Sequence, residues 1–143
     1  MNEMKRLLTI HLCILLCIGL SSCGISNAQS ISSYIWHLEF ITDLDGNLLF
    51  SGPEHGNLDV LDLALRFEKE RFTLNDNTSQ QEWTGTYSLE RVDNSYKLEL
   101  TFENSEKPVF GVYGIRVYSD NSEKATITLQ TNNNILSFVG EDS

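Results

Sequence analysis

The residues of this 143-residue chain that could carry out chemistry are few and far apart in the sequence. Metal sites need histidine, cysteine or carboxylate ligands that converge on one point. After residue 22 the chain contains one cysteine, Cys23, and two histidines, His37 and His55. We expect His37 to titrate on the outer face of a strand, while His55 lies beside Glu54 in a loop, where a ligand or proton-switch role is an open alternative. The sequence therefore predicts no metal site and no cofactor.

Motifs of nucleophilic catalysis are absent from the sequence. It contains no Gly-X-Ser-X-Gly segment, no phosphate-binding glycine loop and no cysteine–histidine pair that could form a nucleophile. Carboxylates are plentiful, with 20 Asp and Glu residues, but solvated carboxylates on strands have ordinary acidity unless their surroundings perturb it. We therefore predict that the protein is not an enzyme.

Residues 43–47, with the sequence Asp-Leu-Asp-Gly-Asn, offer oxygens at alternate positions as calcium loops do. The full EF-hand spacing and its terminal Glu are missing, and Asp45-Gly46 is also a strong hairpin signal. The pattern favours a turn, with a calcium site as the alternative. This turn opens the longest irregular segment, residues 43–62, for which a functional lid and a solvated connection are both open.

The N-terminal residues 1–22 have the pattern of a secretory signal. Lys5 and Arg6 form a positive region, and the apolar run from Leu7 to Leu20 is shorter than the roughly 20 apolar residues that span a membrane. An uncleaved anchor is the alternative. We expect a signal peptide at 1–22, a tether at 23–33 and one folded domain at 34–143.

The signal ends in Leu20-Ser21-Ser22-Cys23, which resembles the lipobox of bacterial lipoproteins. The resemblance implies cleavage before Cys23, lipidation of its thiol and attachment to the membrane through acyl chains such as palmitate. Cys13 and Cys17 would be lost with the signal, so the folded domain would contain no disulfide. No Asp follows Cys23, which by resemblance to enteric lipoproteins favours the outer membrane of the bacterial cell envelope.

The chain is acidic, with a formal charge of −10. Loss of Glu3, Lys5 and Arg6 with the signal would make it −11. Nucleic acid is excluded as a partner, because phosphate binding needs a concentrated basic surface. The charge would steer a cationic protein such as a host lysozyme or protease. It would equally serve to keep an exported domain in solution.

From Tyr34 onward, apolar residues recur with a period of two, which indicates β-strands. Trp36, Leu38 and Phe40 would share one face of the first strand, and Leu98 and Leu100 would point inward from a later one. Short turns between the segments predict antiparallel neighbours. We predict an all-β fold of about eight antiparallel strands in an up-and-down meander that closes into a barrel, with a β-sandwich as the alternative. The predicted strands are residues 35–42, 63–68, 72–74, 84–90, 96–103, 109–118, 125–130 and 135–139.

Aromatic residues supply the remaining material for a site. Trp83, Tyr87, Phe110 and Tyr113 could line an apolar pocket with phenol hydroxyls as polar groups. The alternative is that they fill the core of a small barrel. The glycines at positions 111 and 114, on either side of Tyr113, would allow a bend in the strand or leave room for a ligand.

Several short motifs recur in a fixed order along the chain: Trp36-His37-Leu38, Asp45-Gly46, Leu65-Arg66-Phe67, Arg71-Phe72-Thr73-Leu74, Gly85-Thr86-Tyr87-Ser88-Leu89, Lys97-Leu98-Glu99-Leu100, Thr128-Leu129 and Leu136-Ser137-Phe138. This order resembles the small lipocalin-like lipoproteins of Bacteroidetes. A weaker similarity, through Trp36 and Gly85-Thr86-Tyr87, is to the META-domain lipoproteins. The first resemblance implies a β-barrel that binds a small ligand in its mouth.

Two functions follow from these observations. The first is a lipid-anchored, monomeric, lipocalin-like binding module that holds a small apolar ligand. The second is an acidic inhibitor or protein-binding lipoprotein directed at a cationic partner. A hollow barrel would favour the first, whereas a filled interior with a protruding loop at 43–62 would favour the second.

Overall fold

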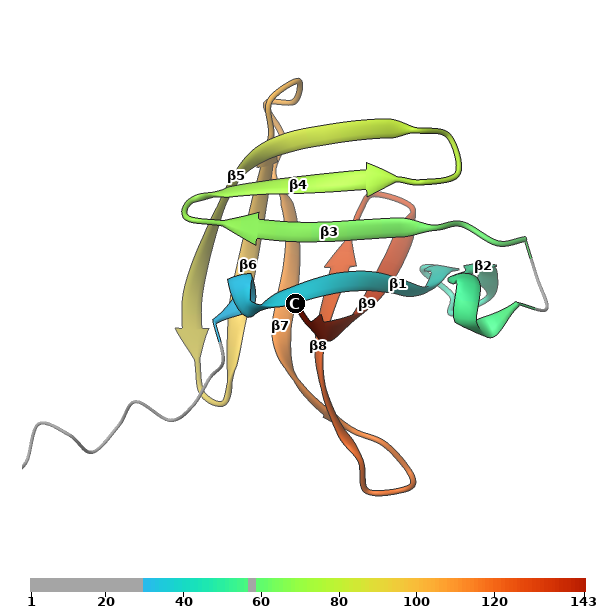
Figure 1. Cartoon of the computed structure of the whole chain (residues 1–143). Helices are drawn as coiled ribbons and strands as arrows, with labels where there is room; N and C mark the ends of the chain where they lie inside the picture. Colours follow the sequence, from blue (N-terminus) through green and yellow to red (C-terminus); the bar gives the residue numbers. More distant parts are fainter. Residues whose placement is uncertain (1–29, 57–58) are drawn as a thin grey trace, which may run out of the picture.

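The structure, a computed structural model, describes residues 30–56 and 59–143. These residues form an antiparallel barrel with its strands in up-and-down order (Figure 1). The strands are β1 (Tyr34–Asp43), β2 (Leu48–Ser51), β3 (Leu63–Glu68), β4 (Arg71–Asp76), β5 (Gln81–Val92), β6 (Ser95–Phe102), β7 (Val109–Val117), β8 (Glu123–Gln130) and β9 (Asn134–Asp142). Two 3-10 turns, η1 (Ile31–Ser33) and η2 (Pro53–His55), complete the described elements.

Eight strands close the barrel. From β3 to β9 each strand pairs with the next, and β1 pairs with β9 from Tyr34 to Asp43. The ring closes on the other side of β1 through Trp36 and His37, which pair with β3, while the far end of β1 pairs with the short β2. The predicted eight-stranded meander is confirmed, and the fold is consistent with a lipocalin-like barrel. The sandwich alternative is wrong, because the β1–β9 pairing joins the two ends of the sheet.

Alternation along the strands places apolar side chains inside the barrel, as the period of two predicts. On β6, which lies between β5 and β7, Leu98 and Leu100 are fully buried, whereas Lys97 is exposed. Trp36 and Leu38 on β1 are buried in the same core. The core therefore runs along the inside of the barrel and needs no second sheet to cover it.

A register shift in β1 contradicts one predicted facing. The pairing with β9 slips between Leu38 and Phe40, so that Phe40 lies opposite Ser137 and Ile41 lies opposite Leu136. The extra residue at this bulge moves Phe40 off the face of Leu38, and Ile41 takes the inward position. Strict alternation from sequence cannot foresee such an inserted residue.

The N-terminal turn η1 closes one end of the barrel. Ile31 is only 2% exposed, and the indole Nε1 of Trp36 donates a hydrogen bond to the Ile31 carbonyl at 3.0 Å. The backbone N–H of Ser143 donates to the Ser33 carbonyl, which joins both ends of the domain here. The described residues Ile31–Ser33 thus pack on the barrel, whereas the sequence places them in the tether.

An aromatic cluster packs directly above this closed end. The Trp36 ring meets Tyr113 edge-on with 5.5 Å between centroids, and Tyr113 stacks on Tyr96 at 5.5 Å. Burial raises the pKa of Tyr113 to about 12, with further contributions from the neighbouring Tyr34 and Tyr96 phenols. Close side-chain packing therefore fills this half of the barrel.

Glycine at position 111 serves packing between strands. A Cβ built there would lie 2.4 Å from the carbonyl oxygen of Thr128 and 2.7 Å from the Leu129 side chain on β8. No side chain fits in that space, so Gly111 lets β7 and β8 approach closely. Of the two roles considered for the glycines of β7, room for a ligand does not apply at this position.

The predicted signal peptide, residues 1–22, and the predicted lipidation site, Cys23, lie outside the described residues. Within residues 30–56 and 59–143, no helix is both long and apolar enough to cross a membrane.

Candidate functional site

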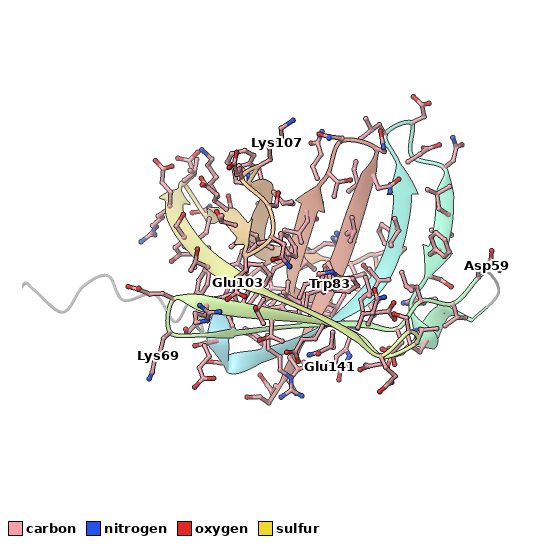
Figure 2. All side chains as sticks on the ribbon, turned by 90° about the horizontal axis from the view of Figure 1, so that it is seen from above. Asp59, Lys69, Trp83, Glu103, Lys107 and Glu141 are labelled. Carbon is pink, nitrogen blue, oxygen red and sulfur yellow. The ribbon has the colours of Figure 1, made fainter. Side chains whose placement is uncertain are left out.

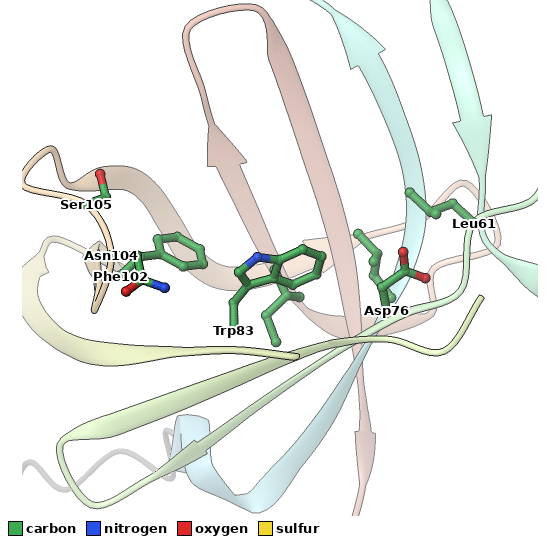
Figure 3. A pocket seen from close by; sticks show the side chains of 8 residues that line it. Leu61, Asp76, Trp83, Phe102, Asn104 and Ser105 are labelled. Atoms are coloured by element: carbon green, nitrogen blue, oxygen red, sulfur yellow. The ribbon is translucent and has the colours of Figure 1, made fainter. Parts of the chain in front are cut away.

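A cavity of about 490 Å³ opens at the end of the barrel opposite η1 (Figure 3). Successive antiparallel strands reach this open end alternately with their first and last residues. The cavity is bounded by the start of β3, the end of β4, the start of β5, the end of β6 and the loop that follows β6. Its described lining residues are Leu61, Leu63, Leu74, Asp76, Trp83, Phe102, Asn104 and Ser105.

Trp83 is the largest side chain in the cavity wall. It lies near the start of β5, opposite Leu74 of β4, and points toward the middle of the barrel, as Figure 2 shows from above. In the close view its indole lies between Phe102 on one side and Asp76 and Leu61 on the other (Figure 3). The ring is 36% exposed, so an aromatic face is available to a ligand.

The tight turn between β4 and β5 holds Asp76 at the cavity. The backbone N–H groups of Thr78 and Ser79 donate to Asp76 Oδ1 at 2.8 and 3.2 Å, and the Ser79 hydroxyl donates to Oδ2 at 2.6 Å. These hydrogen bonds, led by that of the Ser79 side chain, lower the pKa of Asp76. The carboxylate is therefore ionised at neutral pH and fixed in place.

Phe102 anchors the opposite wall of the cavity. Its ring packs edge-on against the buried Phe72, with 4.9 Å between centroids, which fixes its position at the end of β6. The N–H of Ser105 donates to the Phe102 carbonyl at 3.1 Å, so the chain turns sharply here and brings Asn104 to the rim. An amide and a hydroxyl thus supply polar groups beside an apolar wall, a combination common in ligand sites.

The four predicted ligand-binding aromatics do not come together. Trp83 lines the cavity. Tyr87 packs against Phe67 at 4.7 Å and donates its hydroxyl to the Lys69 carbonyl at 2.7 Å, near the closed end. Tyr113 belongs to the buried cluster with Trp36, and Phe110 is 45% exposed on the outer face. One of the four therefore shares the cavity.

Sequence reasoning missed most of the cavity lining. Leu61, Leu63 and Leu74 are ordinary apolar residues that only the barrel geometry brings to its open end. Asp76 had a usable signal, because an Asp followed by Thr and Ser two and three residues later is typical of a side-chain-capped turn. When the Asp ends a strand at a position that faces the barrel interior, as Asp76 does, its carboxylate lies at the opening of the barrel.

Segment 43–62 forms a turn, a short strand and a 3-10 turn. Asp43 Oδ1 accepts hydrogen bonds from the N–H groups of Asp45 and Asn47 at 3.0 and 2.8 Å, and Gly46 has φ of +87°. These contacts confirm the predicted turn and lower the pKa of Asp43, chiefly through the Asn47 side chain. Among its described residues, the large apolar side chains that are exposed are Leu44, Leu48, Leu49, Phe50 and Val60.

Among the described residues, the two histidines lie away from the cavity. The His37 Nε2 lies 3.7 Å from the Glu141 carboxylate on the barrel exterior, and His55 is exposed in η2. Within the described ranges 30–56 and 59–143, no group of three or more His, Cys, Asp or Glu side chains could hold a metal ion.

Comparisons of the chain with protein families, with curated proteins and with solved structures found no match. The class of molecule therefore follows from its geometry. A closed β-barrel that is packed at one end and hollow at the other is compatible with a binding module.

Proposed function

We propose that this protein is an exported, lipid-anchored binding module that holds a small apolar ligand in the open end of its barrel. The cavity of about 490 Å³ carries the proposal. Its volume lies within the range of about 300–1,000 Å³ that ligand pockets occupy. Leu61, Leu63, Leu74, Trp83 and Phe102 make its wall predominantly apolar. The resemblance to lipocalin-like lipoproteins supports the same function.

The position of Ser30, the first described residue, fits the anchored arrangement. Ser30 lies at the closed end, beside the buried Ile31, and the cavity lies at the other end. An anchor at Cys23 would be joined to Ser30 by a short segment that spans about 25 Å at most when extended. The closed end would then face the membrane, and the cavity would open away from it.

A fluorescent apolar probe tests the binding function. We expect N-phenyl-naphthylamine to gain fluorescence in the cavity, and Trp83→Ala to weaken its binding about tenfold, or about 1.4 kcal/mol. Phe110→Ala is the matched control, because Phe110 has similar exposure but lies on the outer face. Absence of probe binding, or equal losses in both variants, would contradict the proposal.

Palmitate labelling tests the anchor separately. Cys23→Ser should abolish labelling and leave an uncleaved or mislocalised precursor, because the thiol is the acceptor for the lipid in the proposed lipobox. Labelling of the variant at the level of the unchanged chain would show that the lipid is not attached at Cys23.

The exposed apolar residues of segment 43–62 favour a second candidate function, docking to a cationic protein. Leu48, Leu49 and Phe50 on β2 are exposed, and the exposed carboxylates Asp45 and Glu54 come before and after this strand in the sequence. Such a patch fits a partner with apolar and basic surface. Titration calorimetry with lysozyme tests this candidate, and binding that weakens with salt and is lost in Phe50→Ser would support it. Absence of binding at low salt would count against a lysozyme-type partner.

A further inference from the structure

The charge of the described cavity lining is negative. Of its described lining residues, Asp76 is the one with a charged side chain, and none is basic. Glu103, the residue after the lining residue Phe102, forms an ion pair with Arg71. The ion pairs found within residues 30–56 and 59–143 do not include Asp76. The cavity therefore presents a negative charge that is hydrogen-bonded to its own turn and has no ion-pair partner in the described part of the chain.

Asp76 and Trp83 lie close enough to act on one ligand. Leu74 pairs with Trp83 and Asp76 pairs with Gln81, so Asp76 and Trp83 are diagonal neighbours on the inner face of β4 and β5. Such neighbours are about 7–8 Å apart at the backbone, within reach of a large aromatic side chain. Figure 3 shows the carboxylate and the indole in the same cavity.

The chemistry of these two groups selects among ligands. A carboxylate beside apolar walls lowers the energy of a nearby cation, and the face of an indole also attracts cations within about 6 Å of its centre. An anionic head group would instead be repelled by Asp76 and would find no basic partner in the cavity. The hydrogen bonds of the turn keep the Asp76 pKa low, so this selection holds at neutral pH.

We propose that the cavity takes an organic cation, an apolar body that carries an ammonium group. The body would pack against Leu61, Leu63 and Phe102, and the ammonium group would lie between the Asp76 carboxylate and the Trp83 ring. This inference rests on the proposed function, since it names the class of ligand that the same cavity binds.

Three probes that share a phenylalkyl body and carry a positive, a neutral or a negative head group test the inference: phenylbutylammonium, phenylbutanol and phenylbutanoate. Titration calorimetry would use the processed protein, purified from a bacterial expression host and reconstituted in phosphatidylcholine nanodiscs. Empty nanodiscs serve as the blank. We expect the ammonium probe to bind about tenfold more tightly than the alcohol, a difference of about 1.4 kcal/mol, and the carboxylate probe to bind most weakly. The preference should shrink as salt concentration rises.

Asp76→Asn should remove the preference for the ammonium probe, because the amide oxygen can still accept from the Thr78 and Ser79 N–H groups, and the amide nitrogen can donate to the Ser79 hydroxyl, without the charge. Asp120→Asn is the matched control. Asp120 accepts hydrogen bonds from the Ser122 N–H and hydroxyl in a similar turn, but in the β7–β8 connection at the other end of the barrel. If Asp76→Asn fails to fold, the ranking of the three probes on the unchanged chain and its salt dependence decide.

Equal binding of ammonium and alcohol, tightest binding of the carboxylate probe, or a preference that persists in Asp76→Asn would overturn the cation inference and leave the apolar cavity in place. If none of the three probes binds and N-phenyl-naphthylamine also fails to bind, the proposed function falls together with the inference.

Discussion

The two tryptophans of the chain lie toward opposite ends of the barrel and differ in their burial and in their contacts. Trp36 is fully buried, contacts Tyr34 and Tyr113 and donates its indole hydrogen bond to Ile31. Trp83 is 36% exposed and lines the cavity at the opposite end. The same residue type therefore fills the core at one end and presents a surface at the other.

The contrast follows from how each end is covered. At the closed end, η1 packs against β3 and buries Ile31, whose carbonyl accepts the Trp36 hydrogen bond. At the open end, polar groups in turns such as that of Asp76 form hydrogen bonds within the turn, so these turns do not fill the barrel interior. A small domain without disulfides must take its stability from the packed part. The hollow part is then free to be shaped for a ligand.

The largest expected effect tests the inward facing of β6, on which both ends depend. Leu98→Asp should unfold the domain, because it forfeits about 2 kcal/mol of apolar burial and adds an unpaired buried charge to a fold with about 5–15 kcal/mol of stability. Lys97→Ala should cost less than about 1 kcal/mol, including the loss of its contact over Phe110. Circular dichroism melts compare the two, and the reverse order would show that the faces are assigned backwards.

The second effect tests the closed end directly. Trp36→Ala should lower the free energy of unfolding by about 3–5 kcal/mol, because it leaves a large cavity in the core and removes the donor to the Ile31 carbonyl. Urea denaturation followed by circular dichroism measures this loss. A loss below about 1 kcal/mol would mean that η1 does not close the barrel in solution.

The barrel could be predicted from the sequence because strands such as β6 alternate clearly between apolar and polar residues. The β6 pattern of Leu98 and Leu100 between polar neighbours leaves one choice of face, and short turns leave one choice of neighbour. What the pattern could not show are local departures from alternation. The bulge that displaces Phe40 depends on the pairing of β1 with β9, which is distant in the sequence. The burial of Ile31 depends on its contact with Trp36 from a 3-10 turn, an irregular element that leaves no periodic pattern in the sequence.

The sequence predicted the cavity much less well than it predicted the fold. Aromatic type alone suggested a site at Trp83, Tyr87, Phe110 and Tyr113, but these residues differ in their distance from the open end and in their face. Phe110 is one residue out of phase with the inward Gly111, so it faces solvent. Tyr87 lies two pleats beyond Trp83, toward the closed end. Depth along a strand decides which inward residues line a mouth, and that depth is known only once the register is known.

A pH dependence should distinguish the aromatic cluster at the closed end. Burial raises the pKa of Tyr113 to about 12, so the folded state holds this proton more tightly than the unfolded state does. The stability from this group is complete below pH 10 and is lost as the pH rises from about 10 to about 12. Tyr113→Phe should flatten the fall of Tm over that range. Parallel curves for the variant and the unchanged protein would contradict the buried placement of Tyr113.

The smallest expected effect on stability is at the open end and completes the comparison. Trp83→Ala should lower the free energy of unfolding by about 1–2 kcal/mol, well below the loss for Trp36→Ala, since the ring is partly exposed and its removal enlarges a cavity that is already open to solvent. Urea denaturation followed by circular dichroism gives both values on the same scale. Equal losses for the two tryptophans would mean that Trp83 is packed in solution as tightly as Trp36. The open end would then be filled, and a ligand cavity beside Trp83 would have no physical basis.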